Sequence, residues 1–154
     1  MPTVIHFYRT GDPYGELSNF AAYPIELDGE CWRTSEHYFQ AQKFLRESDR
    51  QDIRDEASPM RAAKIGRDRS RPIQAEWDAV KDEVMLKALR AKFTQHESLR
   101  TLLLGTNDAE LVEHTANDRY WADGGDGTGA NVLGKLLMQV REELRSVSTG
   151  TAPA

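Results

Sequence analysis

The chain has 154 residues, of which 39% are hydrophobic and 29% charged, and its 25 acidic against 20 basic residues give a formal net charge of −5. This balance argues against non-specific binding to nucleic acid, which needs a basic surplus. A single cysteine, Cys31, excludes an internal disulfide, and no apolar run approaches the ~18 residues that suggest a membrane span. Residues 1–10 lack a signal-peptide pattern, so we expect one domain in a reducing, cytoplasmic setting without a membrane partner.

Short strands are predicted in the first third of the chain. Val4–Tyr8 is β-branched and aromatic, which is typical of a strand. Two further runs, Pro24–Leu27 and Glu30–Trp32, flank the dipeptide Asp28-Gly29. Because Asp-Gly tolerates the positive φ of a tight turn, this pattern predicts a β-hairpin.

Helices are predicted over most of the remaining chain. Thr34 or Ser35 can cap the first, and Ser58-Pro59 places a cap before a proline at the first position of the second. The predicted helices are Glu36–Arg46, Met60–Gly66, Asp78–Phe93, Glu97–Leu104, Ala109–Glu113 and Asn131–Leu144. A few N-terminal strands precede many helices without β-α-β alternation. We therefore predict an α+β fold, a single mostly helical domain over residues 1–145, and a flexible tail over residues 146–154.

One polar stripe is predicted on the first helix. Glu36, Gln40 and Lys43 lie at positions i, i+4 and i+7, which share a helix face. In a cleft they would combine an acid/base with a nitrogen nucleophile. Spacing alone favours the other interpretation, a solvated polar face. The preceding hairpin and the adjacent aromatic residues Tyr38 and Phe39 are unusual for a fully solvated helix.

A glycine-rich segment, residues 120–131, precedes the last predicted helix. Its glycines allow a ligand to approach closely, and the N-terminus of the following helix can bind an anion. Asp123 and Asp126 are candidates for acid/base chemistry or for binding ribose hydroxyls, and Trp121 is a candidate for stacking on a base. The segment matches neither a P-loop nor a dinucleotide fingerprint. The alternative is an irregular surface loop.

Residues 61–71 hold five basic residues against one acidic residue, a local charge of +4. A phosphate group is the obvious partner of such a segment. The alternative is a solvated basic stretch neutralised by nearby acids, namely Asp49, Asp52, Asp55 and Glu56. The sequence leaves both interpretations open.

Two further observations concern aromatic and metal-binding residues. Trp77, at the entry of a predicted helix, is a candidate for stacking on a base. The four histidines (His6, His37, His96 and His114) show no metal-ligand spacing. We therefore predict no metal site and no cofactor.

Several segments, taken in order, resemble one known family. They are Leu17–Phe20, Trp32–Phe44, Gly66-Arg67, Trp77, Leu111–Glu113, Asn117–Trp121 and Gly129–Met138. Together they extend over about residues 4–145 and resemble the YbiA/NADAR family, most closely its bacterial YbiA-like branch. The motifs are long and ordered, so chance is a poor explanation.

The resemblance implies an α+β domain that hydrolyses N-glycosidic bonds. For the YbiA-like branch the implied substrates are phosphorylated ribosylamino-pyrimidines, reactive early intermediates of riboflavin synthesis. For other branches the implied substrate is ADP-ribose attached to a guanine amino group in nucleic acid. In both substrates, ribose is bonded to an exocyclic amine, and the sugar ring can open to give an imine. A lysine could then replace the exocyclic amine in that imine. A non-catalytic ADP-ribose-binding module is the third hypothesis, and the net charge of −5 favours a small metabolite over a nucleic-acid strand.

The resemblance also implies roles for individual residues. Glu36, Trp77 and Asp123 form the implied catalytic set, with Lys43 as the amine that would form an imine. The predicted substrate-binding residues are Asn19, Arg67, Trp121, Asp126 and Asn131. Among them, Arg67 is predicted to bind the 5′-phosphate.

Overall fold

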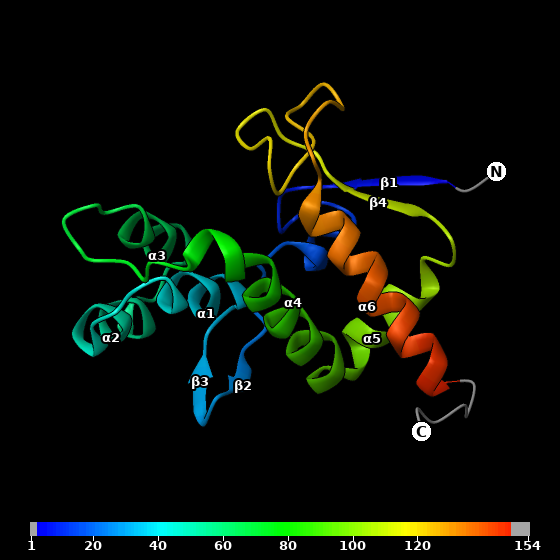
Figure 1. Cartoon of the computed structure of the whole chain (residues 1–154). Coiled ribbons are helices and arrows are strands. Elements are labelled where there is room, and N and C mark those ends of the chain that lie inside the picture. The colour runs from blue at the N-terminus through cyan, green and yellow to red at the C-terminus, as the bar shows by residue number, and fades with distance from the viewer. Residues whose placement is uncertain (1–2, 149–154) are drawn as a thin grey trace. The chain divides into compact units, whose positions relative to one another are not determined.

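The computed structural model describes residues 3–148 of the chain (Figure 1). The chain forms two compact units. The central unit is Asn19–Lys92, and the terminal unit combines the chain up to Ser18 with the chain from Phe93 onward. Helices dominate and only short strands accompany them, so the predicted α+β class is confirmed.

The central unit begins with the predicted hairpin. β2 (Ile25–Leu27) and β3 (Glu30–Trp32) pair in antiparallel orientation. Asp28 and Gly29 between them have φ angles of 55° and 79°, and a two-residue turn of this kind requires a positive φ at both positions. The turn chemistry of Asp-Gly therefore sets the register of the hairpin.

Four helices follow the hairpin: α1 (Ser35–Gln42), α2 (Glu47–Asp55), α3 (Pro59–Gly66) and α4 (Trp77–Gln95), whose end from Phe93 on belongs to the terminal unit. Two of them begin at the predicted caps. Thr34 Oγ1 accepts a hydrogen bond from the His37 N–H at 3.2 Å, and Ser58 Oγ accepts one from the Arg61 N–H at 3.3 Å.

The first helix ends at Gln42, earlier than the predicted Arg46. Beyond it, Phe44 forms an isolated antiparallel bridge with Ile73, and the Gln74 N–H donates to the Lys43 carbonyl at 2.9 Å. The backbone here bonds to a segment distant in sequence instead of continuing the helix.

The sequence did not predict α2. Only two of its side chains, Asp49 and Ile53, are buried, so the helix carries almost no hydrophobic period. Ion pairs attach it to its neighbours: Arg54 binds Glu30 of β3, and Arg71 lies 2.9 Å from Asp49. Tertiary contacts, which a local pattern does not contain, therefore stabilise this helix.

The core of the central unit packs around α1. Its buried members are Ile25, Trp32, Tyr38, Ala41, Phe44, Ile53, Ala62, Ala88 and Ala91. The rings of Trp32 and Tyr38 meet edge to face with centroids 5.6 Å apart, and the Tyr38 hydroxyl donates to Asp28 at 2.7 Å. The core therefore fixes α1 against the hairpin.

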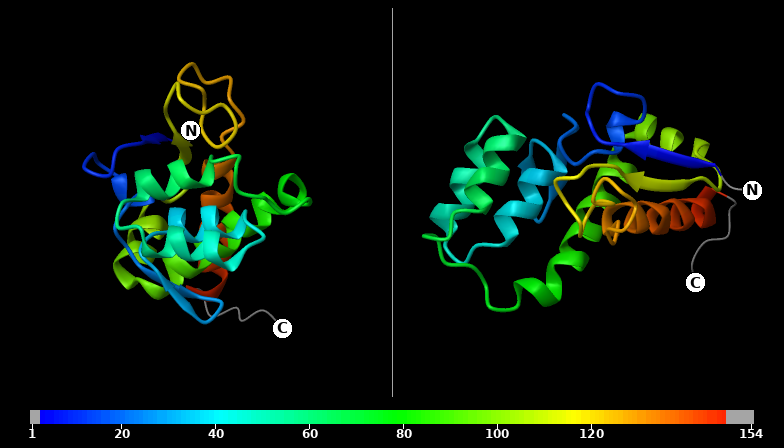
Figure 2. Two further views of the ribbon diagram at one scale, coloured as in Figure 1. Left: turned by 90° about the vertical axis from the view of Figure 1, so that its left-hand side faces the viewer. Right: turned by 90° about the horizontal axis from the view of Figure 1, so that it is seen from above.

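The terminal unit contains a two-stranded parallel sheet. β1 (Val4–Phe7) pairs with β4 (Glu110–Glu113). Figures 1 and 2 show the two strands side by side, with α6 (Val132–Ser148) next to β4. A Cβ on Gly134 of α6 would overlap the Leu111 carbonyl, so glycine allows this close packing.

The helix predicted over Ala109–Glu113 is wrong, because most of this segment forms β4. The strands are therefore not confined to the N-terminal third. The apolar run Leu111-Val112 is too short to distinguish a strand from a helix by periodicity. Pairing with β1, near the other end of the chain, selects the strand.

The remaining elements of the terminal unit are a 3-10 helix, η1 (Gly15–Leu17), and α5 (Glu97–Gly105). The helices predicted over Glu97–Leu104 and Asn131–Leu144 are confirmed. α6 continues through Ser148, so the segment predicted as a flexible tail begins helical, and residues 149–154 lie outside the described residues. Within residues 3–148, no helix is long and apolar enough to cross a membrane.

Candidate active site

The polar stripe of α1 is buried. Glu36, Gln40 and Lys43 have exposed fractions of 8%, 7% and 8%. The amide NH₂ of Gln40 donates to Glu36 Oε2 at 2.7 Å. The predicted shared face is confirmed, and its interpretation as a solvated face is wrong. Burying a carboxylate and an amine costs free energy unless they are paired, so packing alone does not account for this stripe.

Gly66, the last residue of α3, lies directly against the stripe. Lys43 Nζ donates to the Gly66 carbonyl at 3.0 Å. A Cβ on Gly66 would overlap the side-chain amide of Gln40, so glycine allows α1 and α3 to approach this closely. The glycine of the Gly66-Arg67 motif therefore has a packing role beside Lys43.

Lys43 has an unusual titration behaviour. Its pKa is lowered from 10.5 to about 8, mainly by burial and then by the positive charge of Arg69, with smaller contributions from Arg67 and Lys81. Glu36 acts in the opposite direction and raises the pKa of Lys43, but burial and the cations outweigh it. A lysine with this pKa is neutral part of the time near neutral pH, which a nitrogen nucleophile requires.

An aromatic ring, that of Trp77, lies near this amine. Trp77, the first residue of α4, is 7% exposed, and its ring centroid lies 5.0 Å from that of Phe39. Lys43 Nζ lies 5.8 Å from the centroid of the Trp77 ring, within the range of a cation–π contact. The ring of Trp77 is therefore one of the groups next to the buried amine.

Asn19 holds the start of α1. Its Oδ1 accepts a hydrogen bond from the Ser35 hydroxyl at 2.7 Å, and its backbone carbonyl accepts one from the Glu36 N–H at 3.2 Å. Its Nδ2 lies 3.3 Å from Met85 Sδ on α4. The buried residue Asn19 therefore helps to position Glu36 at the start of α1.

One part of the basic segment is neutralised. Arg71 lies 2.9 Å from Asp49 and 2.7 Å from Asp52, and Arg61 lies 3.9 Å from Glu56. The pKa of Arg71 is raised, first by its hydrogen bond to Asp52. For these two arginines, the interpretation as a neutralised stretch holds.

The other part of the segment remains open to an anion. Lys64, Arg67 and Arg69 are exposed, and among the described residues no ion pair involves them. The charges of Arg69 and Arg67 are close enough to Lys43 to lower its pKa. A phosphate bound by these arginines would therefore lie near the buried amine.

The glycine-rich segment also holds a buried carboxylate, Asp123, which is 4% exposed. Its Oδ2 lies 2.7 Å from His114 Nδ1, and its Oδ1 accepts hydrogen bonds from the N–H groups of Gly125 at 2.8 Å and Thr115 at 3.2 Å. Burial acts to raise the pKa of Asp123, but the bonds from His114, Gly125 and Thr115 together lower it. Asp123 is therefore held as an anion.

The other candidates in this segment differ in exposure. Trp121 is half-buried, and its ring centroid lies 5.0 Å from that of Tyr120. Asp126 is exposed and accepts hydrogen bonds from the Thr128 hydroxyl and N–H at 2.7 and 3.0 Å. The side chain of Asn131 is committed to the backbone of β4: its Nδ2 donates to Leu111 O at 2.9 Å, and its Oδ1 accepts from a strand N–H at 3.0 Å.

Sequence reasoning missed two residues of this second cluster. His6 and His114 come together with Asp123, and each of the three offers a ligand atom within 4.8 Å of the others. Their spacing along the chain gives no signal, because the cluster exists only through the pairing of β1 with β4 and the fold of the glycine-rich segment. Of the predicted site residues, Glu36, Lys43 and Trp77 come together in the central unit.

Similarity to known proteins defines the class of this chain. The NADAR domain family model matches residues 6–145. The chain is 63% identical over 142 residues to a protein named N-glycosidase YbiA from Escherichia coli, covering 92% of this chain and 89% of that one. A protein named N-glycosidase from Nostoc punctiforme is 42% identical, covering 93% and 94%. The chain belongs to the NADAR domain family, and the predicted resemblance is confirmed.

Two further matches support this assignment. The NMR structure of Escherichia coli YbiA superposes with a TM-score of 0.90 at 58% identity and covers 100% of this chain and 92% of that one. A protein named riboflavin biosynthesis protein from Vibrio vulnificus is 40% identical and covers 94% of this chain but 40% of its own length.

Proposed function

We propose that this chain is an N-glycosidase that hydrolyses the bond between ribose 5-phosphate and the exocyclic amine of ribosylamino-pyrimidines in riboflavin synthesis. Family membership and the names of the relatives support the reaction class. The observation that carries the mechanism is Lys43, a buried amine whose pKa is lowered to about 8. It shares the polar stripe of α1 with Glu36 and lies near the ring of Trp77.

The proposed chemistry begins with ring opening. The ribosylamine opens to an imine between C1 and the exocyclic nitrogen, and the ring oxygen takes a proton. Neutral Lys43 then adds to C1, and its two N–H protons pass in turn to the exocyclic nitrogen. The bond between C1 and that nitrogen breaks, and the free aminopyrimidine leaves with an intact amino group. Water hydrolyses the resulting imine between Lys43 and C1, which releases ribose 5-phosphate and restores the amine.

Glu36 is the proposed acid/base of these steps. Glu36 lies one helical turn before Gln40, whose side-chain amide donates a hydrogen bond to it. Glu36 would donate a proton to the departing amine and accept one from the attacking water. Trp77 would hold the pyrimidine by stacking. Asp123 stays in the proposed catalytic set on the strength of the family resemblance.

The phosphate is the second part of the proposed substrate. Arg67 and Arg69 are exposed, and their positive charges lower the pKa of Lys43. An arginine binds a phosphate through charge-assisted hydrogen bonds. The name of the Vibrio vulnificus relative favours a riboflavin intermediate as the substrate. ADP-ribose on a guanine amino group is the alternative substrate, because it has the same ribose on an exocyclic amine.

The test incubates the protein with each substrate and follows release of the free base or of ribose 5-phosphate. Borohydride added during turnover should reduce the imine and leave the sugar attached to Lys43, which mass spectrometry would locate. Turnover without an adduct, with activity retained in Lys43→Arg, would replace this route by direct attack of water. Release from neither substrate, with tight ADP-ribose binding, would favour the non-catalytic module. EDTA should not reduce activity, because the proposed chemistry uses no metal.

A further inference from the structure

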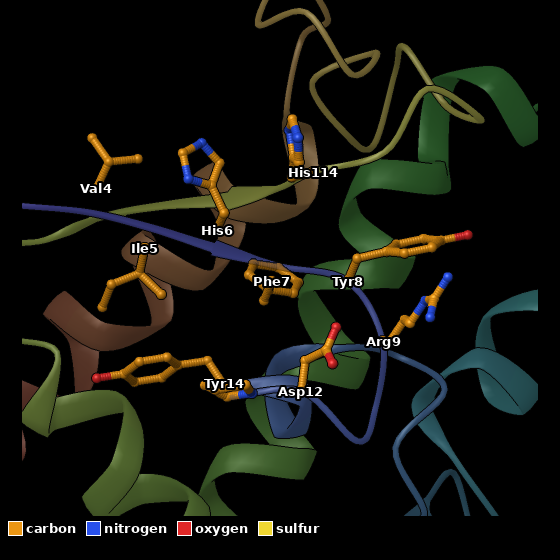
Figure 3. A pocket seen from close by; sticks show the side chains of 10 residues that line it. Val4, Ile5, His6, Phe7, Tyr8, Arg9, Asp12, Tyr14 and His114 are labelled. Carbon is orange, nitrogen blue, oxygen red and sulfur yellow. The ribbon is translucent and has the colours of Figure 1, made fainter.

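Two histidine rings and a buried carboxylate meet in the terminal unit. His6 lies on β1 and His114 follows β4, and their ring centroids are 5.0 Å apart at an interplanar angle of 66°. Figure 3 shows the two rings on the same side of the strands. Asp123 completes the cluster through its 2.7 Å contact with His114 Nδ1.

We propose that His6, His114 and Asp123 form a binding site for a zinc ion. Two imidazole nitrogens and one carboxylate oxygen are the donor set of zinc sites that leave a coordination position open. Among residues 3–148, this is the one cluster of histidine, cysteine and acidic side chains whose ligand atoms lie so close together. The proposal concerns metal binding and does not make zinc a cofactor of the N-glycosidase reaction.

The carboxylate of this cluster is oriented in advance. Both Gly125 and Thr115 donate backbone N–H bonds to Oδ1 of Asp123, which leaves Oδ2 directed at His114. Hydrogen bonds of this kind orient the ligands of metal sites and strengthen binding. Burial of Asp123, at 4% exposure, adds to this fixed geometry.

Zinc would enter between His114 Nδ1 and Asp123 Oδ2, which now lie 2.7 Å apart. Two ligand atoms on one tetrahedral zinc ion lie about 3.3 Å apart, so binding requires a shift of roughly half an ångström. The side chain of His114 is 50% exposed, and His6 is exposed too, so both rings have room to turn.

The surroundings leave the ion open to water. His6 and His114 line a cavity of about 550 Å³, and His6 and Asp123 line another of about 360 Å³. Glu110 in the smaller cavity favours a cation and Lys135 opposes one. Water can therefore fill the coordination positions that the protein does not.

Zinc at this site would also slow the reaction, because it would occupy Asp123; this consequence rests on the proposed function. The binding measurement does not depend on it. If the chain has no N-glycosidase activity, zinc binding still decides whether the site exists.

The experiment is calorimetric titration of the untagged full chain with zinc chloride, with the visible spectrum of added Co²⁺ as a second readout. We expect one zinc ion per chain, and His6→Gln and His114→Gln should each weaken binding at least about tenfold. The matched controls His96→Gln and Cys31→Ser should bind as the wild type does. In zinc-free buffer, His6→Gln should have the N-glycosidase activity of the wild type. When zinc is added, the wild type should be inhibited and His6→Gln should not. Absence of stoichiometric binding, or unchanged binding in His6→Gln, overturns the proposal.

Discussion

Lys43 and Asp123 are two buried charged residues that the protein holds in opposite ways. In the central unit, the buried side chain of Lys43 donates a hydrogen bond to the Gly66 carbonyl, and burial lowers its pKa to about 8. Asp123 in the terminal unit is buried with three donors, which outweigh burial and lower its pKa. Burial with few partners creates a group that changes its protonation near neutral pH, whereas burial with a full set of partners creates a fixed charge.

The largest expected effect concerns the carboxylate next to the titratable lysine. Glu36→Gln keeps the volume of the side chain and removes its acid/base function, so kcat should fall by roughly 10²- to 10⁴-fold. Steady-state kinetics measures the loss, and thermal unfolding checks that the fold is retained. Glu83→Gln, at an exposed position of α4, is the control and should keep its activity. Full activity in Glu36→Gln would exclude this residue as the acid/base.

The second effect is on stability. Between pH 8 and 10.5 the unfolded chain binds a proton on Lys43 that the folded chain does not, so wild-type stability rises with pH in this window. The lowering of the pKa of Lys43 on folding corresponds to a change of about 3 kcal/mol in the free energy of unfolding across this window. Lys43→Met lacks this dependence, so its stability relative to the wild type should decline by about that amount from pH 7 to 10.5. Denaturant unfolding at several pH values measures it, with exposed Lys135→Met as the control.

For Asp123, the fixed charge, the stabilising contribution should be lost at acidic pH. Asp123→Asn removes the anion that accepts from His114 and from two backbone N–H groups, and it should destabilise the protein by about 1–3 kcal/mol at neutral pH. Because the folded pKa of Asp123 is lowered, its stabilising contribution is present above the unfolded value of 3.8 and is lost as the pH falls through the folded value. The difference in the free energy of unfolding between Asp123→Asn and the wild type should therefore become smaller at acidic pH. Asp126→Asn, at an exposed position of the same segment, should change stability less, and equal losses would contradict the comparison.

The last effect concerns the cations around Lys43 and is confined to one class of ligand. Arg67→Ala should weaken binding of the phosphorylated substrate about tenfold or more, because a charge-assisted hydrogen bond contributes roughly 1.5–3 kcal/mol. Binding of the dephosphorylated nucleoside should be nearly unchanged. Arg61→Ala, an exposed arginine paired with Glu56, is the control from the same basic segment. Equal losses for both ligands would make Arg67 a structural residue.

Local signals in the sequence determined much of the backbone. Asp28-Gly29 specified the hairpin, Thr34 and Ser58 specified the starts of α1 and α3, and hydrophobic periodicity specified α4 and α6. These signals succeed because turn angles, caps and periods depend on neighbouring residues only. The shared face of Glu36, Gln40 and Lys43 is of the same kind, since helix geometry alone dictates it.

Tertiary structure decided what those signals could not. β4 is a strand because β1 pairs with it, and α2 is a helix because Arg71 and Glu30 of other segments hold its charged side chains. The burial of the α1 stripe, the lowered pKa of Lys43 and the cluster of His6, His114 and Asp123 all depend on segments far apart in the chain. Solvation and pairing are properties of the folded surroundings of a residue, so the sequence supplied the groups and only packing set their chemistry.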